Sequence, residues 1–135
     1  MAGYSKRSLV AKLGLKAGSR VSFVNPPDGY DETLGKLPPN VTPVEALEGP
    51  LDFVQFFTKD KEALESEFPA LKAALAYDGM LWISWPKKAA KVETDLNENI
   101  VREIGLANGL VDVKVCAVDE TWSGLKFVYR SEDRK

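Results

Sequence analysis

The residues best suited to chemistry gather where an apolar run ends, in the stretch WISWPKKAAK. Lys87 and Lys88 directly follow Trp85-Pro86, and Lys91 comes soon after them. Ammonium groups at a strand end suit an anionic ligand, and the indole of Trp85 would serve as an apolar or stacking wall. A structural interpretation stays open beside this one, in which the lysines are solvated loop residues and Trp85 is packing.

A helix start follows this stretch. The sequence TDLNE predicts either Thr94 as the N-cap or Asp95 as the first residue of a capping box with Glu98. Because the free N–H groups of a helix start carry partial positive charge, this end also favours an anion. We therefore expect a small anionic or nucleotide-like ligand here, with Asp95 at the rim.

Two asparagines in this helix start have no structural explanation in the sequence. Glu98 and Arg102 are four residues apart, which predicts a surface ion pair between them. Asparagine is a mediocre helix former that prefers caps and turns. Asn97 and Asn99 are therefore the polar residues of this segment that we expect to contact a ligand.

The other strand ends belong to the same edge. Ligands of open α/β sheets bind beyond the carboxyl ends of the strands. Residues 20–25 alternate as a strand does and stop at the turn signal Pro26-Pro27-Asp28-Gly29, and residues 51–58 form a second apolar run. The candidate ligand-binding residues are therefore Asn25, Trp85, Lys87, Lys88, Asp95, Asn97 and Asn99.

No catalytic residue is assigned. The chain has no histidine and one cysteine, so the commonest general base and metal ligand is missing and we expect no metal site. Cys116 lies in an alternating segment and is expected to be a buried small hydrophobe. Asp119 and Glu120 pair two carboxylates near Trp122, but adjacent strand residues point to opposite faces, which favours a polar turn with a packed indole.

Composition is that of one globular domain. The 135 residues are 44% hydrophobic and 28% charged, and we expect a single domain over 1–135. The net charge of −2 gives the whole molecule no footprint for nucleic acid. Residues 1–20 hold five basic groups and no acid, which predicts a solvated helix face or a weak phosphate contact. No secretory or membrane segment is visible, so we expect a soluble, cytoplasmic protein with no membrane partner.

Strands and helices alternate along the chain. The pattern predicts a mostly parallel sheet with helices on both faces and a C-terminal antiparallel hairpin. Residues 26–50 hold six prolines and should be loop with a short edge strand near 41–47. We expect a kink or division at Pro69, a turn at Asp78-Gly79, and a frayed tail over 131–135. The predicted helices are 5–14, 59–75 and 94–107, and the predicted strands are 20–25, 41–47, 51–58, 80–85, 112–118 and 125–130.

The second half, LDFVQFF…LKAALAYDGMLWISWPKK…ENIVREIGLANGLVDVKVCAVDETWSGLKFVYR, resembles the latter half of a class I SAM-dependent methyltransferase. In that family a strand precedes a helix, another strand follows, and a later helix ends with a glycine before a β-hairpin. The whole chain also resembles a small bacterial family of uncharacterised proteins of about this length, a domain of unknown function. Both resemblances imply a Rossmann-like, methyltransferase-like fold. For such a sheet we expect the strand order 2-1-3-4-6-5, with the last strand antiparallel.

The sequence departs from the methyltransferase pattern at the cofactor loop. The family's first strand feeds a glycine-rich loop that lets the backbone approach the cofactor, and an acid at the end of the second strand binds ribose hydroxyls. Here the loop is Asn25-Pro26-Pro27-Asp28-Gly29, whose prolines lack two backbone donors, and no helix pattern follows it. Asp28, Asp31 or Glu45 would have to replace the ribose contact.

Three functions follow from this combination. The first is a non-catalytic domain that binds a small ligand or a partner, with no cofactor. The second is a SAM-dependent methyltransferase with an altered cofactor pocket. The third is a structural or oligomerising subunit, a homo-oligomer with the Pro-rich segment as its contact surface.

Overall fold

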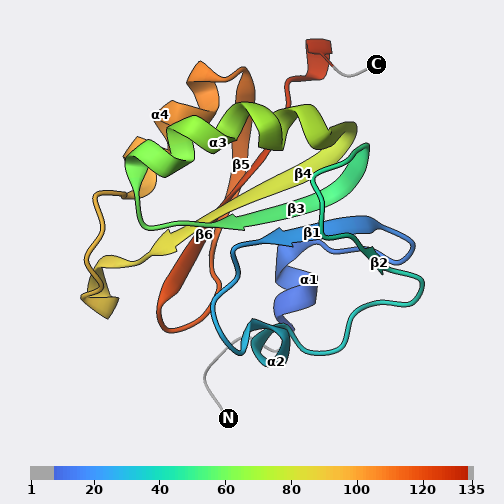
Figure 1. Cartoon of the computed structure of the whole chain (residues 1–135), viewed down its shortest axis with the longest axis horizontal. Coiled ribbons are helices and arrows are strands. Elements are labelled where there is room, and N and C mark those ends of the chain that lie inside the picture. The colour runs from blue at the N-terminus through green and yellow to red at the C-terminus, as the bar shows by residue number, and fades with distance from the viewer. Residues whose placement is uncertain (1–7, 134–135) are drawn as a thin grey trace.

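Six strands form one sheet in the order β2-β1-β3-β4-β6-β5 in the computed structural model, which describes residues 8–133 (Figure 1). β1 to β4 are parallel, β6 is antiparallel to β4, and β5 is antiparallel to β6. The strand order expected from the sequence, with its one reversed strand, is confirmed. The strands are β1 Arg20–Val24, β2 Thr42–Pro43, β3 Leu51–Phe57, β4 Leu75–Pro86, β5 Leu110–Ala117 and β6 Trp122–Tyr129.

Helices cover both faces of the sheet, as expected, but unequally. Two longer helices, α3 Lys61–Ala74 and α4 Glu98–Ala107, lie on one face, and two five-residue helices, α1 Leu9–Leu13 and α2 Tyr30–Leu34, lie on the other (Figure 1). Short 3-10 turns occur at Lys88–Ala90 and Ser131–Asp133. Within residues 8–133, none of the helices has the length and apolar character that crossing a bilayer requires.

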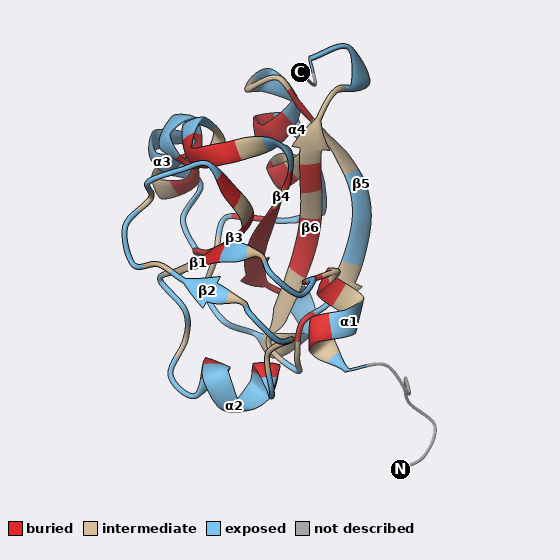
Figure 2. Cartoon of the chain, turned by 90° about the vertical axis from the view of Figure 1, so that its right-hand side faces the viewer, coloured by how far each residue is buried: buried red, intermediate tan, exposed pale blue. Residues whose placement is uncertain are grey.

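The face under α3 and α4 holds the larger core. Phe68 of α3 and Phe127 of β6 are fully buried and meet edge-on at 5.8 Å between ring centroids. Gly105 lets α4 approach this pair, since a Cβ there would lie 2.0 Å from the Phe127 ring. Figure 2 shows buried positions in red on α3, α4, β4 and β6. Dense apolar packing therefore fixes this face.

The opposite face is tied down by specific contacts of two short helices. In α1, Ser8 caps the helix by accepting from the Ala11 N–H at 3.1 Å, and Gly14 ends it at φ 77°. The buried indole of Trp82 donates to the carbonyl of Leu13 at 2.9 Å.

The Pro-rich segment contains more structure than the sequence predicts. Residues 30–34 form α2 where a loop was expected, and the edge strand is only Thr42–Pro43 instead of 41–47. The helix is entered through Gly29 at φ 77°, and the Tyr30 N–H donates to the Pro27 carbonyl at 3.1 Å. This helix is shorter than two turns and has three polar residues between its two apolar ones, so it leaves little apolar periodicity to detect.

Two further boundaries differ from expectation. α3 continues as one helix through Pro69, so the predicted division there is wrong. β4 begins at Leu75, and Asp78-Gly79 lies inside an irregular part of that strand rather than in a turn before it, because Leu51 pairs with Leu75 and Phe53 with Met80. The hairpin strands are also longer than expected, which shortens the connection between β5 and β6 to residues 118–121.

Candidate functional site

The carboxyl ends of β1 and β3 are joined by Asn25. Its backbone is left-handed at φ 62°, and its Nδ2 donates to the carbonyl of Phe57 at 3.0 Å. Asparagine tolerates this conformation better than most residues. Asn25 therefore lies at the expected edge, and the bond it makes there sets the direction in which Pro26 and Pro27 leave the sheet.

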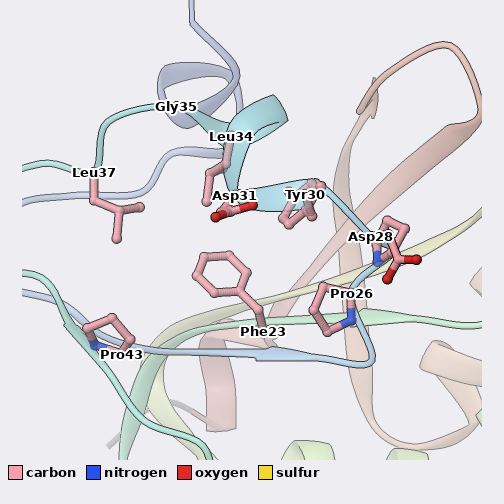
Figure 3. Close-up of a pocket in the computed structure, with 11 residues that line it drawn as sticks. Phe23, Pro26, Asp28, Tyr30, Asp31, Leu34, Gly35, Leu37 and Pro43 are labelled. Carbon is pink, nitrogen blue, oxygen red and sulfur yellow. The ribbon is translucent and has the colours of Figure 1, made fainter.

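A hollow of about 510 Å³ opens beside this turn, between β1, α2 and β2 (Figure 3). Phe23 forms one side, and Leu34 and Leu37 lie across from it in the close-up. A pocket of this size and apolar character is typical of a small-molecule site. The hollow is lined by Phe23, Pro26, Pro27, Asp28, Gly29, Tyr30, Asp31, Leu34, Gly35, Leu37 and Pro43.

The charges that line this hollow are negative. Asp31 lies among the apolar residues near Leu34, whereas Asp28 lies at the Pro26 end (Figure 3). One carboxylate oxygen of Asp31 accepts from the Glu32 N–H at 3.0 Å. The lining set includes neither lysine nor arginine. These carboxylates suit hydroxyl donors or a positive charge on a ligand, and they disfavour a phosphate.

A buried hydrogen-bonded chain supports α2 from below. Tyr30 is almost fully buried, and its hydroxyl donates to Gln55 Oε1 at 2.6 Å. Gln55 Nε2 donates in turn to Ser84 Oγ at 3.1 Å, and both side chains are fully buried. Burial, more than any other cause, raises the pKa of Tyr30 well above its ordinary value, so the phenol stays protonated and keeps donating. The chain links α2, β3 and β4.

The lysine stretch lies apart from this hollow. Trp85 is 4% exposed and packs in the core under α3 and α4. The Lys87 N–H donates to the Thr121 carbonyl at 2.8 Å, which joins the end of β4 to the β5–β6 connection. Lys88 is exposed in the turn that follows. The alternative in which Trp85 is packing therefore agrees with its position.

Asp95 closes the start of α3. Its Oδ1 accepts from the Lys61 N–H at 2.7 Å, and the neighbouring Thr94 hydroxyl donates to the Lys59 carbonyl at 2.6 Å. A second hollow of about 520 Å³ lies here, lined by Lys59, Asp60, Glu93, Thr94 and Asp95. Its three carboxylates outnumber its one lysine, so this hollow does not suit the anion expected from the sequence.

Asn97 is the N-cap of α4. Its Oδ1 accepts from the Ile100 N–H at 2.9 Å, so the helix begins at Glu98 and the predicted caps at Thr94 and Asp95 are wrong. Asn99 accepts from the Arg102 guanidinium at 3.0 Å. Arg102 also pairs with Glu98, as expected, and with Asp112. Both asparagines thus have structural partners, and ligand contact by them stays a prediction.

None of the seven candidate residues lines the apolar hollow, and Asp95 alone among them lines the second one. They lie at the β1–β3 tip, in the core, in the turn after β4, and at the starts of α3 and α4, while the apolar hollow has other walls. Tyr30 and Gln55 were missed by the sequence analysis. One signal for Gln55 was present, because it is the single amide within the apolar run Phe53–Phe57. Across residues 8–133 no three His, Cys, Asp or Glu side chains form a group that would hold a metal ion.

Comparisons with known proteins match the fold alone. No protein-family model matches the sequence, and no curated protein matches it either. Among solved structures, the DhpI–SAH complex superposes with a TM-score of 0.64 at 13% identity, covering 92% of this chain and 83% of that one. The precorrin-6y C5,15-methyltransferase of Geobacter metallireducens gives 0.61 at 12% identity, with coverage of 90% and 86%.

A third similar structure is the fibrillarin of Aeropyrum pernix with natively bound S-adenosyl-L-methionine. It gives a TM-score of 0.58 at 13% identity and covers 89% of this chain and 73% of that one. At these identities the similarity concerns backbone architecture and not the residues of a site. The chain has the Rossmann-like fold of class I methyltransferases.

Proposed function

We propose that this protein binds a nucleoside-like ligand that is neutral or positively charged, in the hollow between β1, α2 and β2. The observation that carries the proposal is the lining of that hollow, which combines an aromatic ring and apolar side chains with two carboxylates and no basic group. S-adenosylmethionine and S-adenosylhomocysteine are the first molecules to test, because each contains an adenosine and the former carries a sulfonium charge.

The position of the hollow supports this choice. It begins where β1 ends and has β2 as a neighbour, which is the side on which ligands of such sheets bind. Phe23 and Pro26 would flank a flat ring, and Asp31 would accept from ribose hydroxyls or face a sulfonium. When bound, S-adenosylmethionine supplies an electrophilic methyl group; transfer of that group is a second question, to be tested once binding is shown.

Pro26 and Pro27 set this loop apart from a glycine-rich cofactor loop. Neither residue has an N–H to donate, so side chains rather than backbone amides must provide most of the recognition. Asp31 is placed for this, since its carboxylate lies among the apolar walls (Figure 3). Adenosine, S-adenosylmethionine and ATP should therefore bind differently, with the triphosphate repelled by the two carboxylates.

Thermal unfolding with a ligand panel tests the proposal. A ligand at one hundred times its dissociation constant stabilises the folded state by about 2.7 kcal/mol, which raises the melting temperature by several degrees. We expect a rise with S-adenosylmethionine or S-adenosylhomocysteine and none with ATP. The Asp31→Asn variant keeps an oxygen for the Glu32 N–H but loses the charge, so its response to S-adenosylmethionine should fall, whereas Glu32→Gln on the same helix is the matched control. No rise with any nucleoside ligand would contradict the proposal.

A second candidate function is self-association, and one observation favours it. β5 is an edge strand, and its Val113 and Val115 are 53% and 49% exposed. Exposed apolar residues on an edge strand favour pairing with another chain. Light scattering at two protein concentrations tests this, and a monomer at both would exclude it.

A further inference from the structure

Four lysines gather on the face of the sheet that α1 covers only in part. Lys114 of β5 and Lys126 of β6 are partners in the antiparallel ladder, so their side chains lie next to each other. Lys12 belongs to α1, and Lys16 follows that helix. We call these four residues the lysine face. It lies outside the hollow proposed above, since none of the four lines it.

Contacts in the structure show how closely the lysine face is assembled. Lys114 Nζ donates to the Lys12 carbonyl at 2.9 Å, which brings the edge strand against the end of α1. Lys126 Nζ would lie 3.7 Å from a Cβ placed on Gly14. Lys16 and Lys126 line one shallow hollow of about 220 Å³. The N-terminal helix and the C-terminal hairpin thus bring their lysines to one surface.

Carboxylates do not neutralise this surface. Within residues 8–133 the ion pairs found are those of Arg102 with Glu98 and Asp112, on the opposite face. The chain carries no Asp or Glu before Asp28, so α1 and the segment after it contribute only positive charge. Two acids lie at the edge of the lysine face: Asp78 lines the shallow hollow with Lys16 and Lys126, and Asp52 lines a neighbouring one with Lys16 and Asp78. The net charge of −2 is therefore a poor guide to this face.

The titration of Lys126 agrees with mutual repulsion among these groups. Burial lowers the pKa of Lys126 first, and the charges of Lys114 and Lys16 lower it further. Lys12 and Lys114 likewise act together on the Cys116 thiol, whose pKa is raised by its burial and lowered by these two charges. A bound anion would relieve this repulsion.

We propose that the lysine face binds the phosphate backbone of a nucleic acid. The groups lie on and just after α1 and on β5 and β6. Lys16 and Lys114 are exposed and Lys12 and Lys126 are half-buried, and this spread suits successive phosphates along a strand better than one enclosed phosphate. Lysine provides point charges without base-specific geometry, so binding is independent of sequence and falls steeply with salt. This inference does not depend on the ligand proposed for the α2 hollow.

Fluorescence anisotropy of a labelled single-stranded RNA, on the order of ten nucleotides long, tests the proposal. The wild-type protein should bind at low salt, with an affinity that falls as salt is raised. The double variant Lys16→Gln/Lys126→Gln should bind about tenfold more weakly, with a salt slope smaller by about 0.7 for each phosphate that it no longer neutralises. The control Lys36→Gln/Lys59→Gln removes the same charge from exposed lysines elsewhere and should bind as the wild type does.

Two further arms keep the result unambiguous. Lys126→Arg keeps the charge and should still bind RNA. A loss of binding in this variant would point to altered packing rather than lost charge. Thermal unfolding of each variant checks that it is folded. Pyrophosphate is the small-phosphate competitor and should displace RNA only at far higher concentration. Equal losses in the two double variants, tight pyrophosphate binding without RNA binding, or binding of anionic lipid vesicles in place of RNA would each overturn the proposal.

Discussion

The two faces of the sheet are covered in different ways. Under α3 and α4, long helices bury a continuous apolar layer that includes Phe68 and Phe127. Under α1 and α2, two five-residue helices leave a hollow of about 510 Å³ at one place and the lysine face at another. A buried polar chain from Tyr30 replaces part of the apolar packing there.

This difference separates the stabilising face from the candidate functional face. The long helices cover their face closely, and the second hollow lies at their starts. The short helices, held by specific bonds, leave an apolar hollow beside the sheet itself. Both binding surfaces inferred for this protein lie on the α1–α2 face. Each prediction below challenges that separation.

The largest expected effect is on the closed face. Phe68→Ala removes a fully buried ring that packs on Phe127 and should lower the free energy of unfolding by about 3–5 kcal/mol. Phe23→Ala removes a half-buried ring beside the hollow and should lower the free energy of unfolding by clearly less than Phe68→Ala does. Chemical denaturation of both variants measures this, and equal losses would mean that the two faces are packed alike.

Tyr30→Phe tests the polar chain on the α2 face. The variant leaves Gln55 Oε1 buried without its donor, which should cost about 1–3 kcal/mol of folding free energy. Gln55→Leu alone should also destabilise, and the double variant should be more stable than the sum of the two single losses implies. Strictly additive losses in the cycle would show that the bond contributes nothing.

Alkaline titration gives an independent view of the same hydroxyl. The pKa of Tyr30 is raised in the folded protein, so its contribution to stability is complete below the ordinary tyrosine pKa and is lost as the pH rises above it. The wild type should therefore lose stability above about pH 10 more steeply than Tyr30→Phe does. Parallel curves for the two proteins would place the Tyr30 hydroxyl in water.

A smaller effect distinguishes the two asparagines of α4. Asn97→Ala removes the N-cap and should cost about 1 kcal/mol. Asn99→Ala loses an exposed hydrogen bond to Arg102 and should destabilise the protein by less than about half as much as Asn97→Ala does. Denaturation midpoints provide the measurement. Neither change should alter nucleoside binding. If a variant loses binding while its stability is unchanged, the substituted asparagine contacts the ligand.

Most strands and helices could be predicted from the sequence, whereas the hollow proposed as the binding site could not. Apolar runs, the Asn108-Gly109 helix end and the closing hairpin predict these strands and helices, because these signals are local and strong. The strand order was expected from the resemblance to methyltransferases, and the sheet confirms it.

α2 could not be predicted, since its sequence Tyr30–Leu34 places three polar residues between two apolar ones and follows two prolines. The equally short α1 carries Leu9, Val10 and Leu13, which show a stripe. The edge at which ligands bind follows from strand direction alone, and Asn25 lies there.

Long-range bonds account for the remaining errors. Thr94 and Asp95 were equally good caps for α4 in the sequence, yet both are engaged by the segment Lys59–Lys61, more than thirty residues away in the chain. That engagement leaves the cap of α4 to Asn97. Trp85 ends a predicted strand, and only the packing of α3 and α4 over it shows that the indole is buried.

Amide NMR spectra recorded during a titration with S-adenosylmethionine test the central claim most directly. The account predicts shifts concentrated in Asp28–Gly35 and in the neighbouring Phe23 and Leu37, which line the hollow. The chemical shifts of the amides from Lys87 to Asn99 should not change. Shifts confined to that second segment would place the ligand at the lysine stretch and contradict the account, and a spectrum unchanged at saturating ligand would contradict binding itself.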